Sequence, residues 1–410
     1  MDCFTPKTLL TVAQASEHIL HGIQALQAWE RVDLRTSLGR VLAHDVTVRM
    51  NVPSQRNSAM DGYAFRYADS QNIPLLNVVG TAFAGHPFQG ELHAGQCVRI
   101  MTGAVVPDVC DTVVMQEHVS REGDNITLQT LPKMGANVRG VGEDLRAGAV
   151  LLAIGHKMTA ADLGLLASQG IAEVDVLRRV RVAFFSTGDE LKSLGETLND
   201  GEIYDSNRYT LFGMLAQLGV DILDLGRLPD QMDVIQQTLR DASRLADVLI
   251  SSGGASVGEA DYIAEALRQT GTVDFWKIAM KPGKPLAFGR VGDDCLFFGL
   301  PGNPVAVMVT FLIFVRPAIL TLMGERVPAK ITFPAISTTP LKKAAGRSDF
   351  QRGICQQQAD GTWQVQTTGA QGSHILSSMS AANCLIVLEQ ERGAVAVGET
   401  VMILPLAGLL

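Results

Sequence analysis

The alternation of strand-like and helix-like segments between residues 180 and 325 constrains the fold of this chain more than any other feature. Strand patterns at 180–186, 220–226 and 247–251 are separated by segments whose apolar residues recur at helical spacing. This alternation predicts a parallel or mostly parallel sheet that is covered by helices on both faces. Ligands of such sheets bind beyond the carboxyl ends of the strands, so the loops that follow these strands are candidate binding loops.

The segments on either side predict further domains. Short β-type runs broken by Gly and Pro fill the region from about residue 45 to 145, which predicts a mostly β domain. Similar runs over 332–410 favour a small β-barrel. Apolar residues at helical spacing predict an amphipathic helix over 8–29. The predicted fold is therefore multidomain: 1–45 with 146–178 as an N-terminal helical and linker domain, 46–145 as a β-rich domain, 179–328 as an α/β domain, and 329–410 as a C-terminal β-barrel.

Charge and composition exclude some classes of function. The chain has 34 basic and 42 acidic residues and a net charge of −8, which argues against nucleic acid as the main partner. Its six cysteines form no CxxC pair, and the N-terminal residues lack the pattern of a signal peptide, so we expect reduced thiols and a cytoplasmic location. No apolar run approaches the about 18 residues that span a membrane, so we expect no membrane segment.

The loop "SSGGASVGEADY" (251–262) follows the strand pattern at 247–251 and combines glycines with carboxylates. Ser251, Gly253 and Gly254 would let backbone N–H groups face an anion, and a helix beginning near Glu259 would add its positive end. Asp261 could hold Mg²⁺, which bridges to phosphate oxygens. The alternative is a tight connection with an acid in the first turn of a helix.

The segment "FWKIAMKPGKPLAFG" (275–289) concentrates positive charge. If 275–281 is a strand, Lys277 and Lys281 project from one face, and like charges side by side are unfavourable unless an anion lies between them. Lys284 follows in a stiff Pro-Gly turn. A solvated edge strand would explain the same pattern.

Further candidate residues lie in other loops. Pro301 and Pro304 in "GLPGNPVAV" stiffen a loop that could be a binding wall or a helix start. Thr102 lies beside a glycine. Acidic residues recur in turns, where each could have only a structural role in forming the turn: Asp61, Asp144, Asp189, Glu190 and Asp230. Together these loops predict a site for a phosphate ester, Mg²⁺ and a second anion.

Several motifs in a fixed order resemble the MoeA family of molybdopterin molybdenumtransferases, which is related to the E domain of gephyrin. They span residues 57–353, with a further match to about 378, and are "NSAMDGYA", "RIMTGAVVP", "GEDLRAG", "STGDEL", "YDSN", "SSGGASVGEADY", "KPGKP", "GLPGNPV", "GRSDFQRG" and "TTGAQGSHILSS". The resemblance implies an elongated homodimer of four-domain subunits. It also implies insertion of molybdenum from molybdate into adenylylated molybdopterin, with release of AMP and assistance from Mg²⁺.

The resemblance also assigns roles to residues. It implies catalytic roles for five carboxylates, two of which (Glu190 and Asp261) would hold the metal: Asp61, Asp144, Glu190, Asp230 and Asp261. The substrate-binding candidates, which include three residues of the glycine loop, are Thr102, Ser251, Gly253, Gly254, Lys277, Lys281, Pro301, Pro304 and Ser373. Contacts with the adenylyltransferase of the same pathway and with molybdoenzyme-maturation proteins are expected. The alternative functions are molybdopterin adenylyltransferase, which would not need the long flanking domains, and a scaffold of the gephyrin type.

Overall fold

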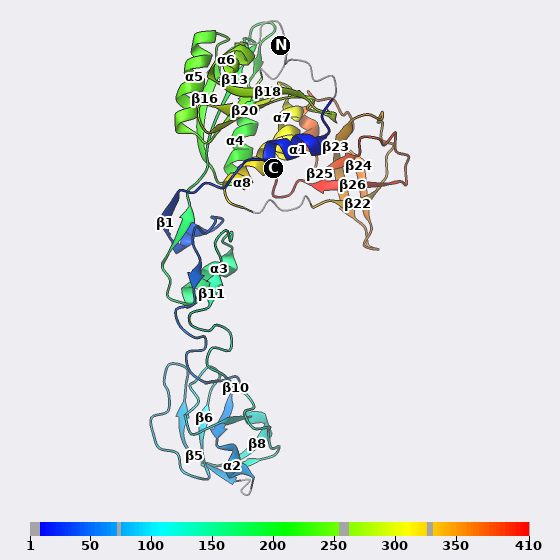
Figure 1. Ribbon diagram of the computed structural model, residues 1–410. Coiled ribbons are helices and arrows are strands. Elements are labelled where there is room, and N and C mark those ends of the chain that lie inside the picture. The colour runs from blue at the N-terminus through cyan, green and yellow to red at the C-terminus, as the bar shows by residue number, and fades with distance from the viewer. Residues whose placement is uncertain (1–8, 72–74, 254–261, 326–330, 410) are drawn as a thin grey trace. The chain divides into compact units, whose positions relative to one another are not determined.

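The computed structural model describes residues 9–71, 75–253, 262–325 and 331–409, and the chain divides into two compact units (Figure 1). The sheet-and-barrel unit consists of Met1–Glu30, Gly39–Val41 and Val176–Leu410. The β-rich unit consists of Arg31–Leu38 and Leu42–Asp175.

The α/β sheet of the sheet-and-barrel unit has the strand order β16-β13-β17-β21-β20-β18. The first four strands in this order run parallel, whereas β20 is antiparallel to β21 and β18 is antiparallel to β20. The prediction of a mostly parallel sheet is therefore confirmed. The strands are β13 (Arg181–Thr187), β16 (Asp221–Leu228), β17 (Val248–Ser252), β18 (Gly271–Lys277), β20 (Pro285–Val291) and β21 (Cys295–Leu300).

Helices cover both faces of this sheet, as neighbouring residues of β13 show. Phe184 is buried in the same core as Leu215 of α4, whereas Phe185 is buried in a second core with Leu239 of α5. The helices are α4 (Ser206–Leu218), α5 (Met232–Leu245) and α6 (Tyr262–Thr270), and the short strands β14 (Leu191–Lys192) and β15 (Ile203–Tyr204) pair beside them. Because side chains alternate along a strand, β13 needs apolar residues in both directions.

One helical run follows β21 and is made of α7 (Pro304–Thr310), the π-turn η3 (Phe311–Val315) and α8 (Arg316–Leu322). It has 19 residues with a mean hydropathy of 2.3, so by length and composition it could cross a membrane. The expectation that no apolar run approaches this length is wrong. In the structure 83% of the run is buried, as in the core helix of a soluble protein, and it packs between the sheet and α1.

The N-terminal helix is shorter than the 8–29 predicted. Helix α1 spans Val12–Leu20, with Thr11 as its N-cap, and the chain leaves helical geometry at His21 before Gly22 takes a φ of 83°. Ile23 and Leu26 nevertheless pack against the same core as the helix. The apolar spacing therefore indicates contact with the core, and Ile23 and Leu26 make that contact without being helical.

The strand predicted over 275–281 is interrupted, so this interpretation is wrong. Strand β18 ends at Lys277, and β19 (Met280–Lys281) pairs with β23 of the barrel. Leu10 lies between them: its N–H donates to the carbonyl of Lys277 at 3.0 Å, and its carbonyl accepts from Ala279 at 2.7 Å. Ala279 is buried like the residues on either side of it, so Lys277 and Lys281 do not share one strand face.

The C-terminal strands form the predicted β-barrel. Strands β23, β24, β22, β26 and β25 follow one another, and β25 pairs back to β23, which closes the ring. Apolar side chains such as Val365, Ile386 and Ile403 fill its interior. The elements are β22 (Phe333–Ser337), β23 (Ser348–Gln357), β24 (Trp363–Thr367), α9 (Leu376–Ser380), β25 (Cys384–Leu388) and β26 (Thr400–Pro405).

The β-rich unit is built on a sheet of order β7-β4-β6-β5-β9-β8, which confirms the mostly β reading of this region. These strands are β4 (Gly62–Phe65), β5 (Leu75–Ala82), β6 (Gln96–Ile100), β7 (Thr112–Met115), β8 (Val119–Glu122) and β9 (Asn125–Leu128). Two-stranded pairs are β2 (Val46–Thr47) with β11 (Val150–Leu152), β3 (Asn57–Ser58) with β10 (Val138–Arg139), and β1 (Trp29–Asp33) with β12 (Glu173–Leu177). The helices are α2 (Tyr67–Ser70) and α3 (Ala160–Ser168), with short turns η1 (Leu34–Ser37) and η2 (Gln116–His118).

Candidate functional site

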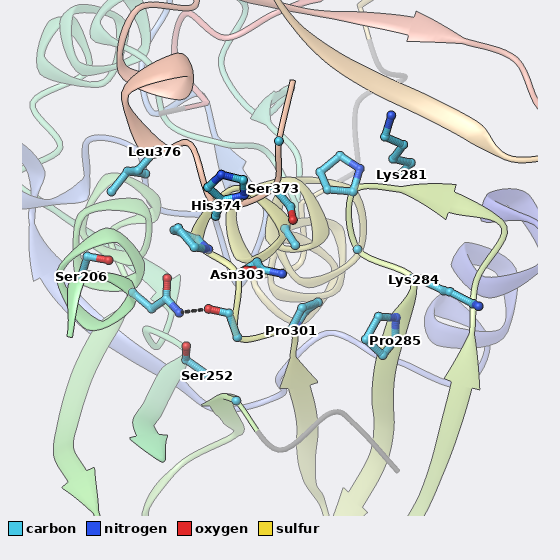
Figure 2. Close-up of a pocket in the computed structure, with 18 of the residues that line it drawn as sticks. Ser206, Ser252, Lys281, Lys284, Pro285, Pro301, Asn303, Ser373, His374 and Leu376 are labelled. Carbon is cyan, nitrogen blue, oxygen red and sulfur yellow. Dashed lines mark hydrogen bonds between the residues drawn. The ribbon is translucent and has the colours of Figure 1, made fainter. Parts of the chain in front are cut away.

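A cavity of about 1870 Å³ lies at the carboxyl ends of the parallel strands, in the sheet-and-barrel unit. Loops after β13, β17 and β21 form one side, and the barrel segment around Ser373 forms another (Figure 2). Parallel strands place their carboxyl ends at one edge of a sheet, so loops that are distant in sequence meet there. Of the predicted residues, the cavity is lined by Glu190, Asp230, Gly253, Lys281, Pro301, Pro304 and Ser373.

The glycine loop after β17 is described only as far as Gly253. Ser251 is completely buried and its hydroxyl donates to the carbonyl of Gly253 at 3.3 Å, whereas Ser252 reaches the cavity. Gly253 has a φ of 96°, and an added Cβ would lie 2.9 Å from the carbonyl oxygen of Thr187, so only glycine suits this position. Its N–H donates to the carbonyl of Leu300, which removes it from ligand binding. Gly254, Asp261 and the helix start predicted near Glu259 lie outside the described residues.

Carboxylates gather at one side of the cavity. Glu190 is exposed and Asp230 is half-buried, and both line the cavity. Burial, followed by the negative charges of Asp189 and Glu190, raises the pKa of Asp230 above its ordinary value. A cation bound here would relieve this repulsion. Within the described part of the chain, no group of three or more His, Cys, Asp and Glu side chains is arranged as a complete metal site.

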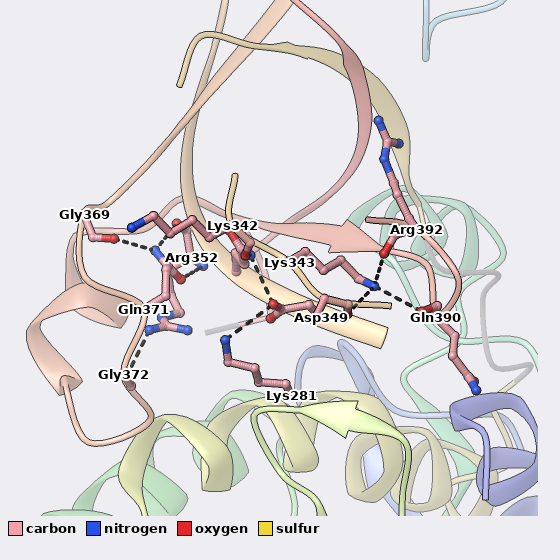
Figure 3. A network of polar contacts seen from close by, with 12 residues as sticks. Lys281, Lys342, Lys343, Asp349, Arg352, Gly369, Gln371, Gly372, Gln390 and Arg392 are labelled. Carbon is pink, nitrogen blue, oxygen red and sulfur yellow. Dashed lines mark hydrogen bonds and ion pairs between the residues drawn. The ribbon is translucent and has the colours of Figure 1, made fainter. Parts of the chain in front are cut away.

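Positive side chains line another part of the same cavity: Lys281, Lys284, Lys342 and Arg347. Lys281 lies 3.7 Å from the buried carboxylate of Asp349 and keeps about half of its side chain exposed (Figure 3). Among the described residues, Lys342 and Arg347 form no ion pair. Lys277 does not line the cavity, although it ends β18 opposite Pro285, which does.

Sequence reasoning did not assign Lys342 to the site, and it noted Arg347 next to Asp349 in "GRSDFQRG" without giving it a binding role. Together with Lys281 they also line a second cavity of about 470 Å³. Neighbouring Lys343 does not contribute a free charge, because its ammonium group donates to the carbonyls of Ala344, Gln390 and Arg392 (Figure 3). A local sequence pattern could not separate Lys342 from Lys343, since only the barrel geometry directs one to the cavity and the other to main-chain carbonyls.

The loop that contains Pro301 and Pro304 joins the sheet side of the cavity to the barrel side. The N–H of Val305, at the start of α7, donates to the carbonyl of Ser373 at 3.1 Å. Buried Arg352 holds the segment before Ser373, because its guanidinium donates to the carbonyl of Gly372 at 3.0 Å (Figure 3). Ser373 is therefore held in a fixed position at the cavity wall.

The remaining predicted residues belong to the β-rich unit. Asp61 is exposed, and its Oδ1 accepts hydrogen bonds from both the N–H and the hydroxyl of Thr102 at 2.7 Å. The backbone and side-chain hydrogen bonds of Thr102, with a smaller contribution from the charge of Arg99, lower the pKa of Asp61 below its ordinary value. Asp144 is exposed, and its N–H donates to the carbonyl of Val52 at 2.9 Å.

Comparison with protein families accounts for most of the chain. Residues 10–170 match the family described as "MoeA N-terminal region (domain I and II)", and residues 334–406 match "MoeA C-terminal region (domain IV)". Residues 183–321, which contain the α/β sheet, match "Probable molybdopterin binding domain".

Full-length relatives show the same pattern. The chain is 47% identical to a molybdopterin molybdenumtransferase of Haemophilus influenzae, over 98% of this chain and 100% of that one. It is 36% identical to a protein of the same description from Nostoc, over 94% and 90% of the two chains, and 32% identical to gephyrin of Dictyostelium discoideum, over 91% and 58%. A solved molybdopterin biosynthesis moeA protein of Pyrococcus horikoshii superposes with a TM-score of 0.83 at 28% identity, over 97% of this chain and 100% of that one.

Proposed function

We propose, since this chain belongs to the MoeA family of molybdopterin molybdenumtransferases, that it inserts molybdenum from molybdate into adenylylated molybdopterin, with release of AMP and assistance from Mg²⁺. The chain is an enzyme of molybdenum cofactor biosynthesis, and molybdopterin is its substrate. The adenylylated form of the substrate, the release of AMP and the metal are the parts that this proposal adds.

One observation carries the proposal: a single cavity presents carboxylates on one side and cations on another. Molybdate is a dianion, and it must approach a substrate that already carries phosphate charges. Two like unit charges about 4 Å apart repel by about 1 kcal/mol in water and about 4 kcal/mol at an effective dielectric constant near 20. Four cations would offset this repulsion on the side of the cavity that we propose for molybdate: Lys281, Lys284, Lys342 and Arg347.

The carboxylates suit a magnesium ion on the diphosphate side. Burial and then the negative charges of Asp189 and Glu190 raise the pKa of Asp230, and a divalent cation would offset those negative charges. Glu190, together with Asp261, would hold Mg²⁺, since carboxylate oxygens are its preferred protein ligands. A magnesium ion held by these residues would supply positive charge that offsets the charge of the phosphates. The contribution of the protein is then to position both substrates and to balance their charges.

The experiment compares two mixtures of the purified protein. One contains adenylylated molybdopterin and Mg²⁺, with or without molybdate, and the other contains molybdopterin, ATP and Mg²⁺. We expect AMP only in the first mixture and only with molybdate. Pyrophosphate release in the second mixture would favour the adenylyltransferase alternative, and turnover in neither would favour a scaffold.

We also propose that the chain acts as a homodimer, as its family resemblance implies. Tyr209 and Phe212 of α4, which do not line the cavity, leave about half of their surfaces exposed and offer an apolar surface that a second chain would cover. Sedimentation at micromolar concentration should give twice the 43.9 kDa of one chain. A stable particle of the single-chain mass would contradict the proposal.

A further inference from the structure

Asn207 ties the Pro301–Pro304 loop to the first turn of α4. Its side-chain Nδ2 donates to the carbonyl of Gly302 at 2.7 Å. On the other side, the N–H of Val305 donates to the carbonyl of Ser373. The loop is thus held between the sheet and the barrel, and both Asn207 and Gly302 line the cavity.

The hydrogen bonding of the Asn207 side chain is incomplete. Its Oδ1 is buried and accepts no hydrogen bond from the described residues, as is also true of Oδ2 of Asp205. A buried acceptor without a partner destabilises a folded protein, and such groups are rare in native structures. All the bonding that Asn207 makes through its side chain is therefore directed to the Gly302 carbonyl.

The flanking residues are held by other contacts, because Pro301 is buried and the Asn303 carbonyl accepts from the N–H of Val307 at 3.0 Å. Among the described residues, the Gly302 carbonyl accepts from Asn207 alone. Gly302 is exposed, and a Cβ added to it would meet no atom within 4 Å. The peptide group between Gly302 and Asn303 is planar, so a bond that fixes the carbonyl also fixes the N–H of Asn303, which points the opposite way. The conformation of this part of the cavity wall depends on the Asn207 side chain.

The side of the cavity next to Asn207 suits an organic ring. Ile203 and Tyr204, just before Asn207 in the chain, and Tyr262 line the cavity and are 42–54% exposed. The cations that suit molybdate lie in the KPGKP turn and in the barrel instead. An aromatic and aliphatic surface stabilises a planar heterocycle and has no preference for a small oxyanion.

We propose that Asn207 is a positioning residue for the ring-bearing substrate: by holding the Gly302 carbonyl it sets the wall against which adenylylated molybdopterin binds. This inference rests on the proposed function for the identity of that substrate. It concerns a side chain that does not touch the reacting atoms and acts through the Pro301–Pro304 loop.

The test compares Asn207→Ala with a control that loses an asparagine elsewhere in the same unit. Asn383 is paired at both ends with the backbone of Cys355, accepting from its N–H at 2.8 Å and donating to its carbonyl at 2.9 Å. Asn207→Ala should retain the wild-type Tm or exceed it, while KM for adenylylated molybdopterin rises about tenfold and half-saturating molybdate stays unchanged. Asn383→Ala should lower Tm and leave KM unchanged.

A second variant and a second readout separate the outcomes. Asn207→Asp has the same size but places a carboxylate oxygen against the Gly302 carbonyl, so it should raise KM at least as much as Asn207→Ala. Hydrogen exchange of the Val305 amide, which donates to the Ser373 carbonyl at the end of the loop, should become faster in both variants in ligand-free protein. If the wild type inserts no molybdenum, the proposed function fails while the exchange measurement still tests the loop. Unchanged exchange, or a loss of Tm with unchanged KM, would overturn the inference.

Discussion

Asp230 and Asp61 are both candidate carboxylates, but the two units hold them differently. In the sheet-and-barrel unit, Asp230 is half-buried near Asp189 and Glu190, and its pKa is raised. In the β-rich unit, Asp61 is exposed, accepts two hydrogen bonds from Thr102, and has a lowered pKa. One carboxylate is destabilised in its charged form by its neighbours, whereas the other is stabilised in that form by them.

The two carboxylates differ in whether a bound ligand would stabilise their charged form. Hydrogen bonds from Thr102 already satisfy Asp61, so it can act as a fixed acceptor without a metal. The negative charge of Asp230 is opposed by burial and by like charges, so a bound cation would improve its environment. The sheet-and-barrel unit also carries the cavity cations, with Lys281 only partly neutralised by Asp349. The charges that line the cavity would therefore be stabilised by bound ligands, whereas Asp61 is already stabilised by the hydrogen bonds of Thr102.

The largest expected effect comes from Asp61→Ala. If Asp61 has the role that the family resemblance assigns, molybdate-dependent AMP release should fall by about 100-fold, which corresponds to about 2.7 kcal/mol. Tm should fall only slightly, because the side chain is exposed and the change removes only its two hydrogen bonds with Thr102. Glu122→Ala, at another exposed acid of the same unit, is the control and should retain wild-type activity. Equal activity in the two variants would reduce Asp61 to a turn residue.

The next effect concerns Lys281→Ala in the sheet-and-barrel unit. Loss of one cation from the cavity should raise the molybdate concentration for half-maximal rate by about tenfold, equivalent to about 1.4 kcal/mol. Asp349 retains a hydrogen bond from Gln351, so the fold should tolerate the change. Lys133→Ala, an exposed lysine of the β-rich unit, removes the same charge and should leave the molybdate requirement unchanged. A lower Tm with an unchanged molybdate requirement would assign Lys281 a structural role.

The sequence predicted the site where local rules apply. Glu190, Asp230 and Pro301 follow the strands of a parallel sheet, and the geometry of such sheets brings their carboxyl ends to one edge. The five-stranded barrel could also be read from short β runs, because turn residues mark the ends of its strands.

Prediction failed where distant segments decide the structure. The strand over 275–281 is divided because Leu10, which is remote in sequence, pairs with both Lys277 and Ala279. Lys342 reaches the cavity, whereas the adjacent Lys343 is held by three carbonyls of the barrel. Asn207 likewise acts on a loop 95 positions further along the chain. Neither the hydrophobic periodicity nor the charge pattern of a local segment predicts contacts with distant segments.

The smallest expected effect distinguishes the two units most directly, because the same change should alter stability with opposite sign. Asp230→Asn removes a charge that the fold opposes, so at pH 8 the variant should have a slightly higher Tm than the wild type. The raised pKa means that the folded protein binds more protons than the unfolded chain above the ordinary aspartate value of 3.8. The stability that Asp230 contributes to the wild type is therefore fully present below pH 3.8 and is lost as pH rises through the raised pKa. Below pH 3.8 asparagine has no advantage over aspartate.

Asp61→Asn should show the reverse. The lowered pKa of Asp61 gives stability that is present above the ordinary value of 3.8 and is lost as pH falls through the lowered pKa, so asparagine should bring no gain at pH 8. Thermal unfolding of both variants between pH 3 and pH 8, with Mg²⁺ titrations of their activity, measures the contrast. We also expect Asp230→Asn to need several-fold more Mg²⁺, because the cation loses a nearby negative charge. A Tm below the wild type at pH 8 with an unchanged Mg²⁺ requirement would show that Asp230 makes a structural contact, and the two units would then not differ in the way proposed.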